Sequence, residues 1–185
     1  MKTKMLVVVD MQNDFIDGSL GTKEAQAIVK NVAKKIEEYK NNGDEVYFTR
    51  DTHFKDYLKT QEGKNLPVEH CILKTKGWEI SSELGYVNDY HVYNKYTFGC
   101  MRLFEDVKLS TNKYDEIELV GLCTDICVVS NALGIKSALE GRDTVVSVDA
   151  SCCAGVTPEA HDHAIAVMKS CQIKIKNEGK EPWRE

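Results

Sequence analysis

A polar stretch from Asp51 to His70 holds the first residues whose types and spacing could do chemistry. It places Asp51 and His53 two residues apart, continues through further acidic residues and ends on a second histidine. The stretch contains chain-breaking residues and has neither a helical nor a strand period, so the sequence predicts a loop. Carboxylates and imidazoles together are suitable ligands for divalent metal ions. We interpret this loop as a candidate metal site, the alternative being a solvated connection.

Cys127 is the candidate nucleophile. It lies at the start of an expected helix that directly follows an apolar strand. The first turn of a helix favours a thiolate, because the helix dipole and the free amides stabilise negative charge. The same amides can hold an oxyanion. The alternative is a buried structural cysteine, which is the commoner role of this residue.

Asp10 and Lys95 could complete a nucleophilic site with this cysteine. Asp10 follows an apolar run and should be shielded from water, while Lys95 follows a strand and precedes Tyr96–Gly99. A lysine ammonium stabilises a thiolate, and a carboxylate can carry the proton. The alternative for Asp10 is a cap or turn residue, and Lys95 taken alone is more typical of a solvated loop.

The elements that must position these residues alternate between strands and helices. The expected strands are Met5–Val9, Glu45–Thr49, His91–Asn94, Ile117–Leu122, Thr144–Val148 and Gln172–Ile175, and the expected helices are Lys23–Lys40, Met101–Leu109, Ile126–Leu139 and Pro158–Lys169. This order predicts an α/β fold, in which one open, mostly parallel sheet carries helices on both faces. No linker divides the chain, so residues 1–185 form one domain, with 177–185 expected as an exposed tail.

The strand order has a positional consequence for the candidate residues. In open α/β sheets, ligands bind beyond the carboxyl ends of the strands. Asp10 ends the first strand, Asp51 and His53 lie just past the second, and Lys95 lies past the third. The segment that carries Cys127 follows the fourth strand. We therefore expect these groups to converge at one edge of the sheet.

Composition excludes several other functional classes. A chain of 185 residues with a net charge of −5 gives no reason to expect nucleic acid or an anionic membrane as partner. The first apolar run, Met5–Val9, is too short for a signal peptide, and no segment approaches the roughly 18 apolar residues of a membrane span. Seven cysteines, an odd number, argue against a disulfide framework. The expected location is the cytoplasm.

Four segments carry a resemblance to isochorismatase-like cysteine hydrolases, and within that superfamily to the nicotinamidases. They are Val9–Phe15, Asp51–His53, Lys95–Gly99 and Gly121–Val128. The resemblance extends from about Met5 to Ser170. The acid and histidine loop marks the nicotinamidases in particular, since several other branches of the superfamily lack a metal there.

The resemblance implies roles for the residues around the nucleophile. It assigns Asp10, Lys95 and Cys127 as the catalytic residues. It implies that Phe15 stacks on a pyridine ring, and that the backbone amides of Cys123 and Cys127 bind the oxyanion. Members of the family often have a cis peptide bond before the residue that corresponds to Cys123.

The resemblance also implies the metal ligands. Asp51, His53 and His70 match the family's ligands, but Tyr57 stands where many nicotinamidases have another histidine. Some members use a glutamate further along the loop, which corresponds to Glu62 here. Two further acidic residues stay open as substitutes for Glu62, namely Asp56 and Glu69. The implied cofactor is one divalent ion, zinc first, with iron or manganese as alternatives, and no organic cofactor is implied.

The implied activity is the hydrolysis of nicotinamide to nicotinate and ammonia through a thioester, a step of NAD salvage. The implied partner is this small-molecule substrate, and a homo-oligomer is possible. One alternative is another amide or carbamoyl hydrolase of the same superfamily. A non-catalytic metal or thiol sensor is a second alternative, and it would release no ammonia.

The remaining histidines and cysteines are interpreted as structural. His161 and His163 are two residues apart on an expected helix and so do not share a face. The adjacent Cys152 and Cys153 are interpreted as packing beside the site.

Overall fold

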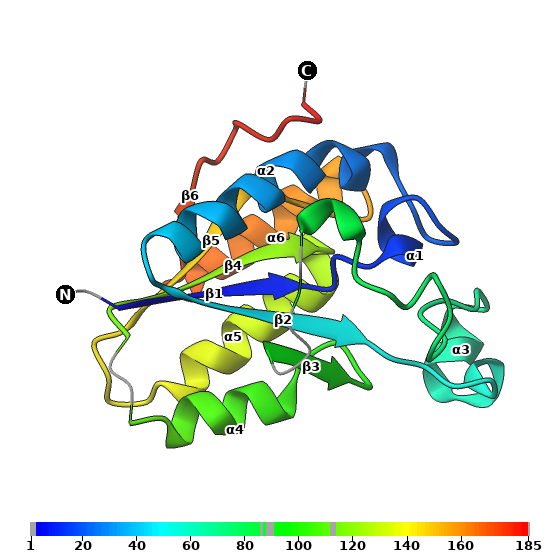
Figure 1. Cartoon of the computed structure of the whole chain (residues 1–185), viewed down its shortest axis with the longest axis horizontal. Coiled ribbons are helices and arrows are strands. Elements are labelled where there is room, and N and C mark those ends of the chain that lie inside the picture. Colours follow the sequence, from blue (N-terminus) through cyan, green and yellow to red (C-terminus); the bar gives the residue numbers. More distant parts are fainter. Residues whose placement is uncertain (1–2, 86, 88–90, 112–113, 185) are drawn as a thin grey trace.

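The computed structural model describes residues 3–85, 87, 91–111 and 114–184, and its centre is one six-stranded sheet (Figure 1). The strands lie in the order β3-β2-β1-β4-β5-β6, and every adjacent pair is parallel. Their bounds are β1 Lys4–Val9, β2 Glu45–Asp51, β3 Val92–Lys95, β4 Glu116–Leu122, β5 Val145–Ala154 and β6 Lys174–Lys176. The expected open α/β fold is confirmed.

Helices cover both faces of the sheet. The α-helices are α1 Asn13–Ile16, α2 Lys23–Asn41, α3 Gln61–Asn65, α4 Met101–Leu109, α5 Val129–Ala138 and α6 Pro158–Ser170. Two short 3₁₀ turns, η1 Tyr57–Lys59 and η2 Ser82–Leu84, and one π-helical turn, η4 Thr124–Val128, complete the described elements. Figure 1 shows α2 on one side of the sheet and α4 and α5 on the other.

Each face has its own apolar core, because the central strands are buried on both sides. The core under α2 includes Ile28 and Val32 of that helix, packed near Val8 of β1. The core on the other face joins α4, α5 and α6, with Ile135 of α5 fully buried. The two layers fix the strand ends firmly, which is the condition for a precise site.

The order of the strands reverses between β1 and β4, which lie side by side at the centre of the sheet. Ligand sites in this architecture lie at such a switch point. Gly121 allows the close approach there, since a Cβ on this residue would lie 2.1 Å from the carbonyl oxygen of Val9. Its φ of +119° is also suited to glycine. Asp10 and Cys123 follow these two strands directly.

The structure shifts several expected boundaries. Asp51 and Lys95 are the last residues of β2 and β3, whereas the sequence suggested that both follow their strands. The strand expected at Thr144–Val148 instead runs from Val145 to Ala154, because it continues through the small and mostly buried residues that follow. The stretch 51–70, expected as a loop, contains η1 and α3.

The expectation of an exposed tail at 177–185 is wrong for part of its described residues. Residues 177–180 are exposed, but Glu181 is buried and Trp183 is half-buried. The indole Nε1 of Trp183 donates to the carbonyl oxygen of Cys153 at 3.0 Å, so the segment is anchored to β5. Within the described part of the chain, no helix has the length and apolar character needed to span a membrane.

Candidate active site

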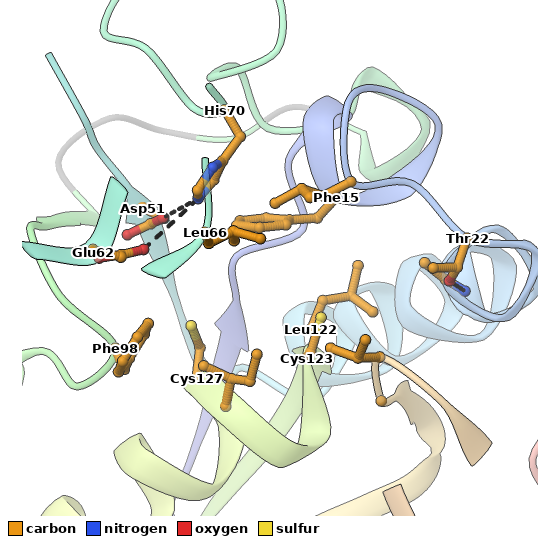
Figure 2. A pocket seen from close by; sticks show the side chains of 15 residues that line it. Phe15, Thr22, Asp51, Glu62, Leu66, His70, Phe98, Leu122, Cys123 and Cys127 are labelled. Atoms are coloured by element: carbon orange, nitrogen blue, oxygen red, sulfur yellow. Dashed lines mark hydrogen bonds and ion pairs between the residues drawn. The ribbon is translucent and has the colours of Figure 1, made fainter. Parts of the chain in front are cut away.

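A cavity of about 220 Å³ lies where the strand ends meet. This volume is below the roughly 300–1,000 Å³ of drug-sized ligand sites, so it suits a small molecule. Figure 2 shows Asp51, Glu62 and His70 gathered at one side of the cavity, with Phe15 and Cys127 facing the space beside them. Phe15 comes from α1, and its ring centroid lies 5.5 Å from that of His70. The aromatic face and the polar cluster therefore border the same space.

Lys95 is the centre of the predicted catalytic group. Its Nζ lies 2.7 Å from Asp10 Oδ2 and 3.5 Å from Cys127 Sγ. It also donates to Asp51 Oδ1 and to the carbonyl oxygen of Thr97, both at 3.1 Å. Lys95 ends β3 and Asp10 follows β1, so two strands that are not neighbours supply this ion pair. The structure thus brings the three predicted catalytic side chains together.

Asp10 is held in one orientation from the opposite side. Thr49 Oγ1 donates to Asp10 Oδ1 at 2.7 Å, while Oδ2 faces Lys95. The backbone of Asp10 has φ = +47°, a left-handed conformation that aspartate tolerates better than most residues. Residues in such conformations are enriched at active sites.

Burial decides the charge states of this group. Burial raises the pKa of Cys127 well above its usual value, and the charge of Lys95 offsets this only in part. The sequence suggested the reverse, a thiolate favoured by a helix start. Burial also raises the pKa of Asp10, against the pull of Lys95. Burial alone would lower the pKa of Lys95, but the negative charges of Asp10, Cys127 and Asp51 hold that pKa well above its usual value. Asp10 is therefore suited to accept the thiol proton.

Cys127 lies in a π-helical turn whose form the sequence did not reveal. It is the fourth residue of η4, and α5 begins only at Val129, so the cysteine precedes the regular helix. The amides of Ile126 and Val128 both donate to the carbonyl oxygen of Cys123 at 3.1 Å. The peptide bond before Cys123 is cis, as the resemblance led us to expect. Both Cys123 and Cys127 line the cavity.

Four side chains form a compact cluster of potential metal ligands at the other side of the cavity. Asp51, His53, Glu62 and His70 each offer one donor atom, and these atoms all lie within 4.8 Å of one another. His53 Nε2 is 2.9 Å from Asp51 Oδ2 and 3.6 Å from Glu62 Oε1. His70 Nε2 is 3.6 Å from Asp51 Oδ2. Two carboxylates and two imidazoles are suitable ligands for zinc, iron or manganese.

The hydrogen bonds of the two histidines fit a bound cation. His53 Nε2 is buried and makes no hydrogen bond to any described residue, although it faces the Asp51 carboxylate. His70 Nδ1 lies 2.8 Å from the carbonyl oxygen of Val68, and because a carbonyl oxygen can only accept a hydrogen bond, Nδ1 carries the hydrogen. The lone pair of His70 Nε2 then faces the cluster, as metal-bound histidines require.

Glu62 reaches this cluster from the first turn of α3. Thr60 caps the helix, since its Oγ1 accepts from the amide of Gly63 at 3.0 Å. The sequence suggested that Gly63 allows a turn, but the structure gives another reason. A Cβ on Gly63 would lie 2.1 Å from the carbonyl oxygen of Tyr57, so only glycine lets α3 pack against η1.

The other acidic candidates lie outside the cluster. Asp56 and Glu69 are exposed, and neither belongs to the group of four donors. Tyr57 is fully buried, with its ring 4.6 Å from that of His53, and its hydroxyl donates to the carbonyl oxygen of Leu66 at 2.9 Å. Tyr57 therefore fills space behind the ligands while its hydroxyl is engaged elsewhere.

Residues 4–177 match the family profile described as the isochorismatase domain. The chain belongs to this family. The resemblance stated from sequence motifs is thereby confirmed, and the protein is an isochorismatase-family hydrolase related to nicotinamidases.

Three relatives illustrate the similarity of this isochorismatase-family chain. The nicotinamidase/pyrazinamidase of Mycobacterium tuberculosis is 26% identical, over 93% of this chain and 97% of the relative. The crystal structure of pyrazinamidase of Pyrococcus horikoshii in complex with zinc has a TM-score of 0.80 at 26% identity, covering 93% of this chain and 97% of that one. The N-carbamoylsarcosine amidase from Thermoplasma acidophilum has a TM-score of 0.76 at 29% identity, covering 95% and 96%. The zinc complex and the four clustered donors together support a divalent-metal site in this family member.

Sequence reasoning missed residues that hold the isochorismatase-family site in place. Asn131 is buried, and its Nδ2 donates to the carbonyl oxygen of Cys127 at 2.8 Å, while its Oδ1 accepts from the amide of Cys100 at 2.9 Å. Its position four residues after the nucleophile is a signal that helical spacing could have revealed. Cys152 and Cys153 do not line the cavity. They point into the cores on opposite faces of β5.

Proposed function

We propose that this protein is a metal-dependent nicotinamidase that hydrolyses nicotinamide to nicotinate and ammonia. The observation that carries the proposal is that three of the four clustered donors, Asp51, Glu62 and His70, line the same small cavity as Cys127. With a metal ion held by these donors, a ligand bound to the ion through a ring nitrogen could present a carboxamide to the thiol. Carbamoyl substrates offer no such ring nitrogen, so the donor cluster favours an aromatic amide.

Binding would use the two walls of the cavity. A divalent ion held by Asp51, His53, Glu62 and His70 supplies, when bound, a Lewis acid that orients an aromatic nitrogen. Phe15 provides an aromatic face for the ring, and Leu66 and Phe98 add apolar surface. The apolar walls exclude water from the ring and leave the amide carbon facing Cys127.

The chemistry follows from the proton positions of the resting site. Asp10 takes the thiol proton as Cys127 attacks the amide carbon, and Lys95 stabilises the thiolate during transfer. The backbone amides of Cys123 and Cys127 would donate hydrogen bonds to the developing oxyanion. Asp10 then returns the proton to the leaving nitrogen, which departs as ammonia and leaves a thioester on Cys127.

Water completes the cycle. Asp10, again a carboxylate, removes a proton from the water that attacks the thioester, and the product acid leaves with the thiol restored. The balance is one amide and one water consumed, with one carboxylic acid and one ammonia formed. Since nicotinate is a precursor of pyridine nucleotides, we propose that the reaction belongs to NAD salvage in the cytoplasm.

Ammonia release from a panel of amides tests the proposal. The metal-free protein, reloaded in turn with Zn²⁺, Fe²⁺ or Mn²⁺, is assayed with nicotinamide, pyrazinamide, benzamide and N-carbamoylsarcosine. We expect turnover of the two aromatic amides that carry a ring nitrogen, and only after metal loading. Benzamide is the matched control, because it differs from nicotinamide only in lacking the ring nitrogen. Preferred turnover of the carbamoyl compound would replace the proposal with the carbamoyl hydrolase alternative, and no ammonia from any amide would favour a sensor.

A further inference from the structure

His161 lies fully buried at the centre of a chain of three polar side chains outside the described site. Its Nδ1 is 2.8 Å from Thr124 Oγ1, and its Nε2 is 3.3 Å from Glu181 Oε1. The side chains of His161 and Glu181 are both fully buried. Thr124 is buried as well. The chain links the C-terminal segment, through α6, to η4, which carries the nucleophile.

The acceptor-only carboxylate fixes the direction of these hydrogen bonds. Ionised Glu181 accepts, so Nε2 of His161 carries the proton and Nδ1 is left as an acceptor for the Thr124 hydroxyl. Arg184 and the amide of Gly179, which donates to Oε1 at 3.2 Å, hold the pKa of Glu181 below its usual value despite burial. Burial lowers the pKa of His161, which keeps the imidazole neutral. The Thr124 hydroxyl therefore has one defined orientation.

Thr124 is the first residue of η4, so its anchor acts on the whole turn. The turn ends in a π-type bond in which the amide of Val129 donates to the carbonyl oxygen of Thr124. Short π-helical turns are rare and are frequently found at functional sites. The loop after β5 is held to the same turn, since Asp125 Oδ1 accepts from the amide of Val156 at 3.0 Å. A side-chain anchor on Thr124 thus restrains both ends of the segment that presents Cys127.

The C-terminal segment is packed so that it can serve as this anchor. Trp183 lies edge-on against His161, with ring centroids 5.0 Å apart, and its Nε1 donates to Cys153. Arg184 pairs with Asp162 of α6 and with Glu181. The family profile ends at residue 177, so Glu181 lies beyond the matched domain.

We propose that Glu181, His161 and Thr124 are positioning residues for the hydrolysis, which hold η4 so that Cys127 and the adjoining amides face the substrate carbon. The inference rests on the proposed function for its choice of substrate, but the predicted effect on Cys127 does not depend on which amide is hydrolysed. None of the three residues lines the cavity, so they act through the turn and not by contact with substrate.

Matched variants test the chain at each of its ends. Thr124→Val removes the hydroxyl at nearly constant volume, and Thr124→Ser restores it. Glu181→Gln keeps the shape of the acid but removes its charge. Glu178→Gln is the control in the same segment, because Glu178 is exposed and pairs only with Lys169 among the described contacts. For each metal-loaded protein, kcat and KM are measured with the best amide of the panel. The rate of Cys127 alkylation by iodoacetamide is followed by peptide mass spectrometry.

We expect Thr124→Val to lower kcat by roughly tenfold, the effect of one buried hydrogen bond, with KM changed less than about twofold. Thr124→Ser should restore kcat, and Glu181→Gln should lower it by several-fold. The alkylation rate of Cys127 should change in the same two variants and not in Glu178→Gln. Parent-like kcat and alkylation in folded Thr124→Val would overturn the proposal. If that variant does not fold, parent-like values in Glu181→Gln would overturn it. If no amide is turned over, the function fails, yet the alkylation rates still decide the positioning role.

Discussion

The ammonium of Lys95 lies 3.1 Å from Oδ1 of Asp51, whose other oxygen faces the histidines of the metal cluster. One carboxylate therefore belongs to both halves of the site. The charges around it hold the pKa of Asp51 well below its usual value in spite of burial. Changes at Asp51 must then affect the catalytic lysine and thiol as well as the metal, whereas changes at His53 should affect the metal alone.

We therefore predict different outcomes for Asp51→Asn and His53→Asn. Both should lose metal on dialysis, which metal analysis measures. In the metal-free state only Asp51→Asn should shift the pH profile of Cys127 alkylation, and the shift should be to lower pH. The sign follows because the Asp51 charge contributes to the raised thiol pKa, so its removal lowers that pKa. Identical alkylation profiles in both variants would show that the two halves are electrostatically independent.

Lys95→Met should slow the reaction without abolishing substrate binding. Loss of the ammonium removes the charge that lowers the pKa of Cys127, so the thiol pKa rises further and the alkylation profile moves to higher pH. We expect kcat to fall by roughly 10²-fold and KM to change little. Lys35→Met is a matched control, because Lys35 is also mostly buried but pairs with Glu118 and Asp149, away from the cavity. An unmoved alkylation profile in Lys95→Met would remove the lysine from this role.

Cys127→Ala should fold normally and lose about 10⁴-fold or more of its activity, because the thiol that forms the thioester is removed. Cys153→Ala is the control for a general thiol effect. Burial raises the pKa of Cys153 well above its usual value, and the residue packs in the core. It should retain most of the parent kcat with a lower melting temperature. Near-parent turnover by folded Cys127→Ala would exclude this cysteine as the nucleophile.

The sequence predicted the fold and the convergence of the site because both depend on regular patterns. Alternating strands and helices impose a parallel sheet, and Asp10, Asp51 and Lys95 were located by the strand ends that carry them. The form of η4 was not predictable, since a π-helical turn has no apolar period of its own. The link from Thr124 through His161 to Glu181 was equally hidden, because 57 positions separate its two ends in the chain and only the packing of α6 connects them.

Acid should destabilise the protein through Glu116. Burial alone would raise the pKa of this residue, but hydrogen bonds from Lys176, Ser147 and Lys4 lower it to about 2. A carboxyl whose folded pKa is depressed contributes stability above its unfolded pKa, and that contribution is lost as the pH falls through the folded value. The melting temperature should therefore fall between about pH 4.5 and pH 2, and less steeply in Glu116→Gln. Equal slopes for parent and variant would assign the acid sensitivity to other carboxyls.

The choice among the three acidic residues of the metal loop can be tested directly. Glu62 is half-buried in α3 with Oε1 3.6 Å from His53 Nε2, while Asp56 and Glu69 are exposed. Loss of a charged ligand should weaken metal binding by at least about 10²-fold, the upper range for outer-shell partners. Glu62→Gln should therefore hold less metal after dialysis, whereas Asp56→Asn and Glu69→Gln should hold as much as the parent.

The same variant separates metal binding from catalysis. Glu62 makes no described contact with Asp10, Lys95 or Cys127, so Glu62→Gln should raise the KM for nicotinamide and recover partly when metal is added in excess. Tyr57→Phe is the matched control, since it removes only a hydroxyl that donates to Leu66, at a cost of about 1 kcal/mol in stability. It should bind metal normally. Tight metal binding by Glu62→Gln, combined with weak binding by Asp56→Asn or Glu69→Gln, would move the ligand to that residue. Tight binding by all three would reduce the protein ligands to Asp51, His53 and His70.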